Sequence, residues 1–163
     1  MTYAGAHGST ELQMASALHF TLPQATLHRA FNALDQALMS RGTTVKSQTG
    51  VPFRLDVANS IWGAPETSFV PAFLDTLAED YGAGIRLTDF AKDPEAARNT
   101  INAWVATWTS DKIQNLLAPG TLDAQTRMVL VNAIYFKAAW ATPFEPKVTQ
   151  PGTFHDNGVP SRA

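Results

Sequence analysis

Apolar residues are densest in residues 128–140, MVLVNAIYFKAAW, a run that carries one amide, Asn132. Most residues of this run are β-branched, aliphatic or aromatic, the types that favour a strand. Even-numbered and odd-numbered positions are both apolar, as in strands that are buried on both sides. The pattern therefore predicts a strand of about thirteen residues, roughly 43 Å long at ~3.3 Å per residue, with both faces covered.

Asn132 is the exception within this run, and it needs hydrogen-bond partners. A buried amide without partners costs about 1–3 kcal/mol. Buried polar groups are generally hydrogen-bonded, so one interpretation is a satisfied structural amide. The other interpretation is an amide with a role in function. The residues alone leave both open.

Upstream of the run, the spacing of apolar residues predicts helices and shorter strands. A capping box of Thr10 and Gln13 predicts a helix that starts there and extends to residue 18. The next helix covers residues 23–41 and ends before Gly42. A polar loop over residues 43–50 follows. The apolar stripe of the second helix consists of Leu27, Phe31, Leu34 and Leu38.

Alternation over residues 53–62 predicts a strand, and a helix over residues 70–81 ends at Gly82. Residues 85–90 form a short strand. A helix then starts at Asp93, with a proline in its first position. Its buried stripe is predicted to be Ile101, Trp104, Val105 and Trp108, and the two tryptophans are interpreted as core packing.

The mixture of strands and helices that cross between them predicts an α+β fold. The chain has 163 residues, a net charge of −2 and no cysteine. We expect one continuous domain that is truncated at both ends, because neither terminus resembles the start or the close of a fold. The first residues lack the charged and apolar regions of a signal peptide. The longest apolar runs are too short to predict a membrane-spanning helix.

Several classes of function are disfavoured by composition. Serine, histidine and aspartate residues are scattered without a nucleophile motif, so we expect no catalytic residues. No histidine spacing indicates a metal site, and we expect no metal and no cofactor. The low charge gives no attraction to nucleic acid or to membranes. The helix over residues 23–41 carries only Arg29 and Arg41, too few cations for a polysaccharide site.

Residues 130–137, LVNAIYFK, resemble the third strand of the central sheet in the serpin family, and the following residues resemble its turn into the next sheet. Ala138 departs from the pattern, because family members usually have glycine after the lysine. The likeness extends upstream to Tyr3 and includes Asn59 in the second strand. The matching residues of the motif are Asn59, Tyr135, Phe136, Lys137, Trp140, Phe144, Thr149, Phe154 and His155.

The resemblance implies roles for two residues. Asn132 matches the amide of the serpin shutter, the hydrogen-bond cluster beneath the place where the central sheet opens. Trp140 matches the indole of the breach, where the reactive loop first enters the sheet. A sheet that opens between two discrete states needs contacts that can be exchanged. The expected fold is a partial serpin fold, with helices packed on part of a large central sheet.

The same resemblance implies a parent protein that inhibits serine (or cysteine) proteases through cleavage and insertion of a reactive loop. Serpins are more than twice this length, and the loop is not in this sequence. The alternative is a non-inhibitory serpin with a carrier, chaperone or storage role. The family suggests an extracellular location. The long strand would have an open edge, so we expect the isolated chain to aggregate.

Overall fold

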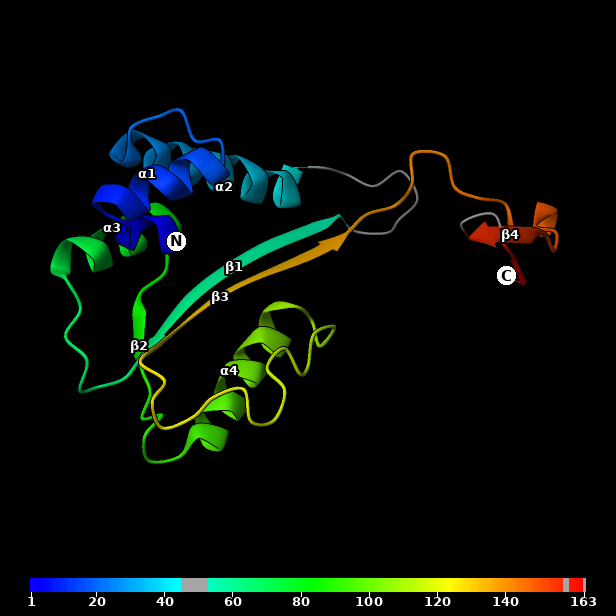
Figure 1. Ribbon diagram of the computed structural model, residues 1–163. Coiled ribbons are helices and arrows are strands. Elements are labelled where there is room, and N and C mark those ends of the chain that lie inside the picture. The colour runs from blue at the N-terminus through cyan, green and yellow to red at the C-terminus, as the bar shows by residue number, and fades with distance from the viewer. Residues whose placement is uncertain (45–52, 157–158, 163) are drawn as a thin grey trace.

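The computed structural model describes residues 1–44, 53–156 and 159–162. Helices lie on both faces of a narrow sheet, which confirms the α+β class (Figure 1). The elements are, in order, η1 (Thr2–Gly5), α1 (Gly8–Ala17), α2 (Gln24–Thr44), β1 (Arg54–Gly63), α3 (Pro71–Tyr81), β2 (Ile85–Leu87), α4 (Pro94–Trp108), β3 (Met128–Lys137), η2 (Pro146–Val148), β4 (Thr153–Asp156) and β5 (Val159–Arg162).

The main sheet has the strand order β2-β1-β3. β1 runs parallel to β2 and antiparallel to β3, in a register that pairs Arg54 with Lys137 at one end and Gly63 with Met128 at the other. β3 therefore forms one edge of the described sheet. The β4–β5 hairpin lies beyond the end of β3, away from the helices (Figure 1).

β3 is shorter than the sequence predicts. It ends at Lys137, so Trp140 follows the strand rather than belonging to it. The register explains the difference, because Lys137 pairs with Arg54, the first residue of β1. Residues after Lys137 have no cross-strand partner on β1, and a strand without a partner is not extended further.

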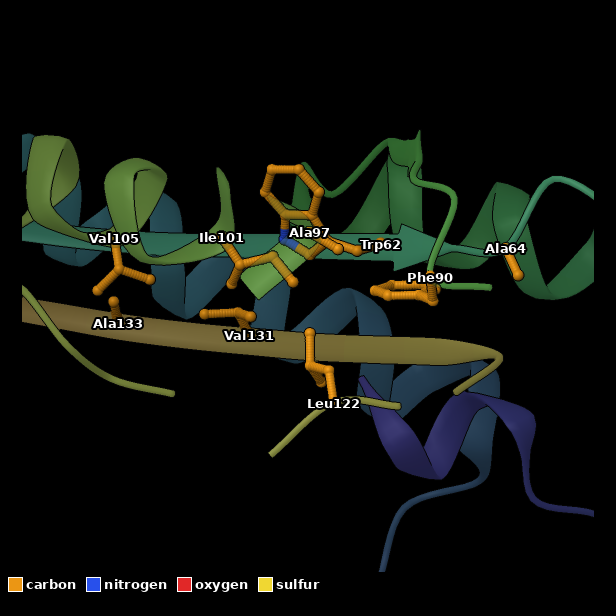
Figure 2. Close-up of a cluster of buried hydrophobic side chains, with 9 residues drawn as sticks. All are labelled: Trp62, Ala64, Phe90, Ala97, Ile101, Val105, Leu122, Val131 and Ala133. Carbon is orange, nitrogen blue, oxygen red and sulfur yellow. The ribbon is translucent and has the colours of Figure 1, made fainter. Parts of the chain in front are cut away.

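One face of the sheet is covered by α4. Ile101 and Val105 point from this helix toward Val131 and Ala133 of β3, and both helix side chains are fully buried (Figure 2). The same cluster includes Trp62 of β1, Leu122 of the loop between α4 and β3, and three further buried residues, Ala64, Phe90 and Ala97. The predicted stripe is confirmed for Ile101 and Val105, whereas Trp108 is 47% exposed at the last turn and is not part of the core.

The other face is tightly packed at one end only, and α2 lies over its middle across a groove. At the packed end η1 and α3 bury Ile61, Leu77 and Ala83, with Leu130 partly buried beside them. Ile134 and Phe136 lie farther along β3 and are 56% and 64% exposed. The prediction that β3 is covered on both faces is therefore wrong for this chain, because α2 leaves a groove beside Ile134, and Phe136 lies near the end of the strand.

Helix ends follow local signals in some places and not in others. Gly82 ends α3 with a φ of 59°, and the carboxylate of Asp93 accepts a hydrogen bond from the Ala96 amide at the start of α4, both as predicted. α1 instead begins at Gly8, so the predicted capping box does not start the helix. α2 continues through Gly42 to Thr44, since glycine weakens a helix by about 1 kcal/mol without preventing it. Most of the predicted loop over residues 43–50 lies outside the described residues.

Candidate functional site

Asn132 forms a hydrogen bond with an amide on the neighbouring strand. It is the register partner of Asn59, and its Nδ2 donates to Oδ1 of Asn59 at 2.9 Å. The pairs on either side along this face are apolar, with Val57 opposite Ile134 in one direction. Asn59 is half-buried and Asn132 is exposed. The two amides are thus a polar pair between apolar pairs on this face.

Asn59 also connects the sheet to α3. Its Nδ2 donates to the carbonyl of Tyr81 over 3.4 Å, at the last residue of the helix. The Tyr81 hydroxyl lies 2.7 Å from Nδ1 of His28 on α2. A continuous series of polar contacts therefore runs from β3 through β1 and α3 to α2.

The aromatic and imidazole groups in this series titrate outside their usual ranges. Burial, with a smaller contribution from the charge of Asp80, raises the pKa of Tyr81 to about 12. Burial, followed by the charge of the Met1 amino group, lowers the pKa of His28, and Asp80 partly opposes this change. At neutral pH Tyr81 is protonated and His28 is uncharged.

A groove of about 360 Å³ lies between α2 and the sheet, and Asn59 and Asn132 both line it. Its remaining walls are largely apolar, and Phe31 and Leu34 of α2 are 37% and 53% exposed there. The stripe of α2 is therefore only partly buried. Because the Asn132 amide lines this groove, there is space beside it for another hydrogen-bond partner.

On the opposite face, hydrogen bonds fix the segments that follow α4. Asn102 is buried, and its side chain pairs with the backbone of Leu117, donating to the carbonyl at 3.0 Å and accepting from the amide at 2.9 Å. This pairing fixes the segment between α4 and β3 against the helix. Arg54 of β1 donates to the Ser110 hydroxyl at 3.0 Å and so ties the far end of α4 to the sheet.

Trp140 and Phe144 form a separate aromatic pair beyond the end of β3. Their rings meet edge to face at 5.8 Å, and the side chains are 71% and 80% exposed. The structure therefore does not bring Trp140 to the Asn59–Asn132 pair. Asn132 lies in the middle of β3 and Trp140 lies beyond its end, and the shutter and breach roles stay predictions.

The other motif residues lie in β3, after η2 and in β4. Tyr135 is half-buried under the guanidinium of Arg54, which lies 5.1 Å from the centre of its ring. Phe136 and Lys137 are exposed at the end of β3, and Thr149 follows η2. Phe154 and His155 lie in β4 opposite Ser161 and Pro160, and their side chains are outside the described structure.

Two relationships escaped the sequence analysis. The pairing of Asn59 with Asn132 joins residues 73 positions apart, and that of His28 with Tyr81 joins residues 53 apart. The sequence did contain one signal for the first pairing, because each asparagine lies on a face of its strand that is otherwise apolar. Nothing in the residues pointed to the second.

The described residues offer no group of three or more histidine, aspartate and glutamate side chains that could hold a metal ion. Within the same part of the chain, no helix has the length and apolarity that a membrane span requires.

Comparison with known proteins gives a consistent result. Leukocyte elastase inhibitor of Bos taurus is 40% identical over 157 residues, which are 96% of this chain and 39% of that protein. Ipis-1 of Ixodes persulcatus is 37% identical over 95% of this chain and 38% of its own. The chain thus spans about 40% of the length of the curated relatives that it matches.

Solved structures show the same likeness. Arabidopsis AtSerpin1 in its native stressed conformation superposes with a TM-score of 0.81 at 30% identity, over 99% of this chain and 40% of that one. A cleaved Serpin 42Da gives 0.80 at 26% identity, over 98% and 40%. Residues 1–162 match the family model described as Serpin (serine protease inhibitor). The chain therefore belongs to the serpin family.

Proposed function

We propose that the whole protein inhibits serine proteases by inserting its cleaved reactive loop into the central sheet beside β3. The observation that carries the proposal is the edge position of β3. This strand has ten residues, one neighbour in the described sheet, and an exchangeable amide at Asn132 in its middle. An unpaired strand edge is a template for one further strand.

The likeness to two forms of serpins supports this proposal. The chain resembles a native stressed serpin and a cleaved serpin almost equally, with TM-scores of 0.81 and 0.80. The part of the fold that this chain covers is thus similar in both forms. The change that accompanies cleavage is then expected beside β3, and β1, β3 and α4 act as one wall of the opening.

The names of the relatives favour inhibition over the alternative of a carrier, chaperone or storage protein. The curated relatives include leukocyte elastase inhibitors of several mammals. The proposed target is therefore a serine protease of the elastase type.

The test is titration of such a protease with the whole protein. We expect residual protease activity to fall linearly to zero near an equimolar ratio, with a complex that survives denaturing electrophoresis. A protease that cuts the protein and keeps its full activity would overturn the proposal and favour the non-inhibitory alternative.

We also propose that the isolated 163-residue chain self-associates through β3. Ile134 and Phe136 are exposed beside the unpaired edge, and such an edge promotes strand pairing between copies. Light scattering should give a mass above that of the monomer, and a concentration-independent monomer mass would contradict this. Secretion of the whole protein stays a prediction from the family, to be tested by fractionation of the producing cells.

A further inference from the structure

His28 is a buried histidine of α2 that lies outside the serpin-like motif. It is 2% exposed, and its ring lies between the rings of Tyr3 and Tyr81, with centres 5.9 and 5.6 Å away. It therefore sits where η1, α2 and α3 meet. Removal of an imidazole from water disfavours its charged form, because the aromatic neighbours do not replace the lost hydration.

Within the described part of the chain, only one of its two ring nitrogens has a hydrogen-bond partner. Nδ1 is 2.7 Å from the Tyr81 hydroxyl, whereas Nε2 is buried without any hydrogen bond. When neutral, the ring accepts from Tyr81 or donates to it through Nδ1, and it leaves a neutral Nε2 unpaired. When protonated, both nitrogens carry hydrogen, and a charged N–H at Nε2 is buried without an acceptor. The packed arrangement therefore fits the neutral ring alone.

The surrounding groups do not compensate for a charge on this ring. Tyr81 of α3 and Tyr3 of η1 contact it, and the charges that act on it are Asp80 of α3 and the amino group of Met1, which precedes η1. Asp80 is the one negative group among them, and its effect is smaller than that of burial. Tyr81, with a pKa of about 12, supplies no negative charge near neutral pH.

Tyr81 is shared between this histidine and the sheet. Its hydroxyl contacts His28, and its backbone carbonyl accepts from Asn59, whose Oδ1 in turn accepts from Asn132. A shift of the C-terminal end of α3 away from α2 would therefore also displace the acceptor of Asn59. The two asparagines would then lose one of the contacts that fix their geometry.

We propose that His28 and Tyr81 form an acid-sensitive latch that couples the α2–α3 contact to the Asn59–Asn132 pair. In the latched state the neutral ring holds Tyr81, and Tyr81 holds Asn59. Protonation of His28 releases the contact and loosens β1 and β3 at the amide pair. The effect on protease inhibition rests on the proposed function, whereas the coupling itself does not.

The direction with pH follows from the lowered pKa. A histidine whose pKa is lower in the packed state than in the open state favours opening as pH falls through its ordinary value near 6.5. Each unit of that lowering increases the equilibrium constant for opening by about tenfold once pH is below both values. The latch is therefore closed at pH 7.5 and weakened near pH 5.5.

The experiment compares the whole protein with three variants. In His28→Asn the amide can occupy the position of Nδ1 and does not titrate in this range. In Tyr81→Phe the hydroxyl is lost and the ring is kept. His19→Asn makes the same change at an exposed histidine and is the matched control. Urea midpoints are measured from pH 7.5 to 5.5, and amide hydrogen exchange is compared between proteins at each single pH.

We expect the wild-type protein and His19→Asn to lose stability across this range and His28→Asn to lose less. At pH 5.5, wild-type amides at residues 57–61 and 130–134 should exchange at least several-fold faster than those of His28→Asn. Tyr81→Phe should already exchange faster than wild type at pH 7.5. Equal pH slopes in wild type and His28→Asn would overturn the latch. A difference in slope with unchanged exchange in β1 and β3 would overturn the coupling. Neither readout uses a protease, so failure of inhibition leaves this test intact.

Discussion

Asn59 and Asn132 face each other across β1 and β3, and one side-chain hydrogen bond of 2.9 Å joins them. An amide pair in an apolar face can break and re-form with other partners, whereas packed apolar layers rearrange only as a whole. The pair is therefore the point of the described sheet where two arrangements can differ in hydrogen bonding without loss of packing.

The strength of this pair can be measured by a double-mutant cycle. We expect Asn59→Ala, Asn132→Ala and the double variant to give a coupling of about 0.5–1.5 kcal/mol in the free energy of unfolding. Asn132→Ala should also change the rate at which the whole protein inhibits its protease. Ile134→Ala is the control on the same face. Additive effects together with a wild-type inhibition rate would contradict a control role for Asn132.

Asn102 holds the segment that connects α4 to β3. Asn102→Ala removes both hydrogen bonds to Leu117, so the partly buried Leu117 amide loses its partner, whereas the carbonyl keeps the hydrogen bond from Arg98 at 3.1 Å. We expect a loss of about 1–3 kcal/mol in the free energy of unfolding and faster proteolysis within residues 109–126. Asn99→Ala, at an exposed position on the same helix, should cost much less. Equal losses would show that the contact with Leu117 contributes little.

Two consecutive residues after α4, Ser110 and Asp111, have φ values of 50° and 59°. The backbone of residues other than glycine is strained in this region of φ. Asp111 is exposed, so Asp111→Gly relieves strain without removing a packed group. We expect a stability gain of about 0.5–1 kcal/mol after the entropic cost of glycine, measured by urea unfolding. Lys112→Gly, where φ is not positive, should destabilise, and a loss with Asp111→Gly would refute the assignment of strain.

Glu95 links the start of α4 to the turn at Gly120. Hydrogen bonds from Arg98 and then from the Gly120 amide lower the pKa of its carboxyl. A lowered pKa contributes stability that is present above the unfolded value near 4.3 and is lost as pH falls through the folded value. Glu95→Gln should therefore lose less stability than wild type between pH 5 and 3. Identical acid transitions in urea titrations would exclude this contribution.

The sequence predicted those elements whose signals are local. Gly82 ends α3 and Asp93 starts α4 because a turn conformation and a side-chain cap depend on neighbouring residues only. The helix start at Gly8 was missed, since the backbone turns into α1 before the capping box is reached. The motif around Asn132 was sufficient to identify the family, but it does not specify which residue forms a hydrogen bond with Asn132.

What was missed depends on distant parts of the chain. The length of β3 is limited by where β1 begins, and the hydrogen bond of Asn132 depends on a register set over all of β1. The burial of His28 arises only when η1, α2 and α3 meet. The exposure of Ile134 and Phe136 was likewise unpredictable. An apolar residue in a strand indicates that its side chain packs against something, but not whether the segment that covers it is within these 163 residues.

The most direct test of a strand-accepting gap beside β3 is the thermal unfolding midpoint of the whole protein before and after proteolytic cleavage of its reactive loop. Insertion of the loop as an additional strand completes the sheet, so we expect a marked rise in the midpoint after cleavage. An unchanged or lower midpoint would contradict it.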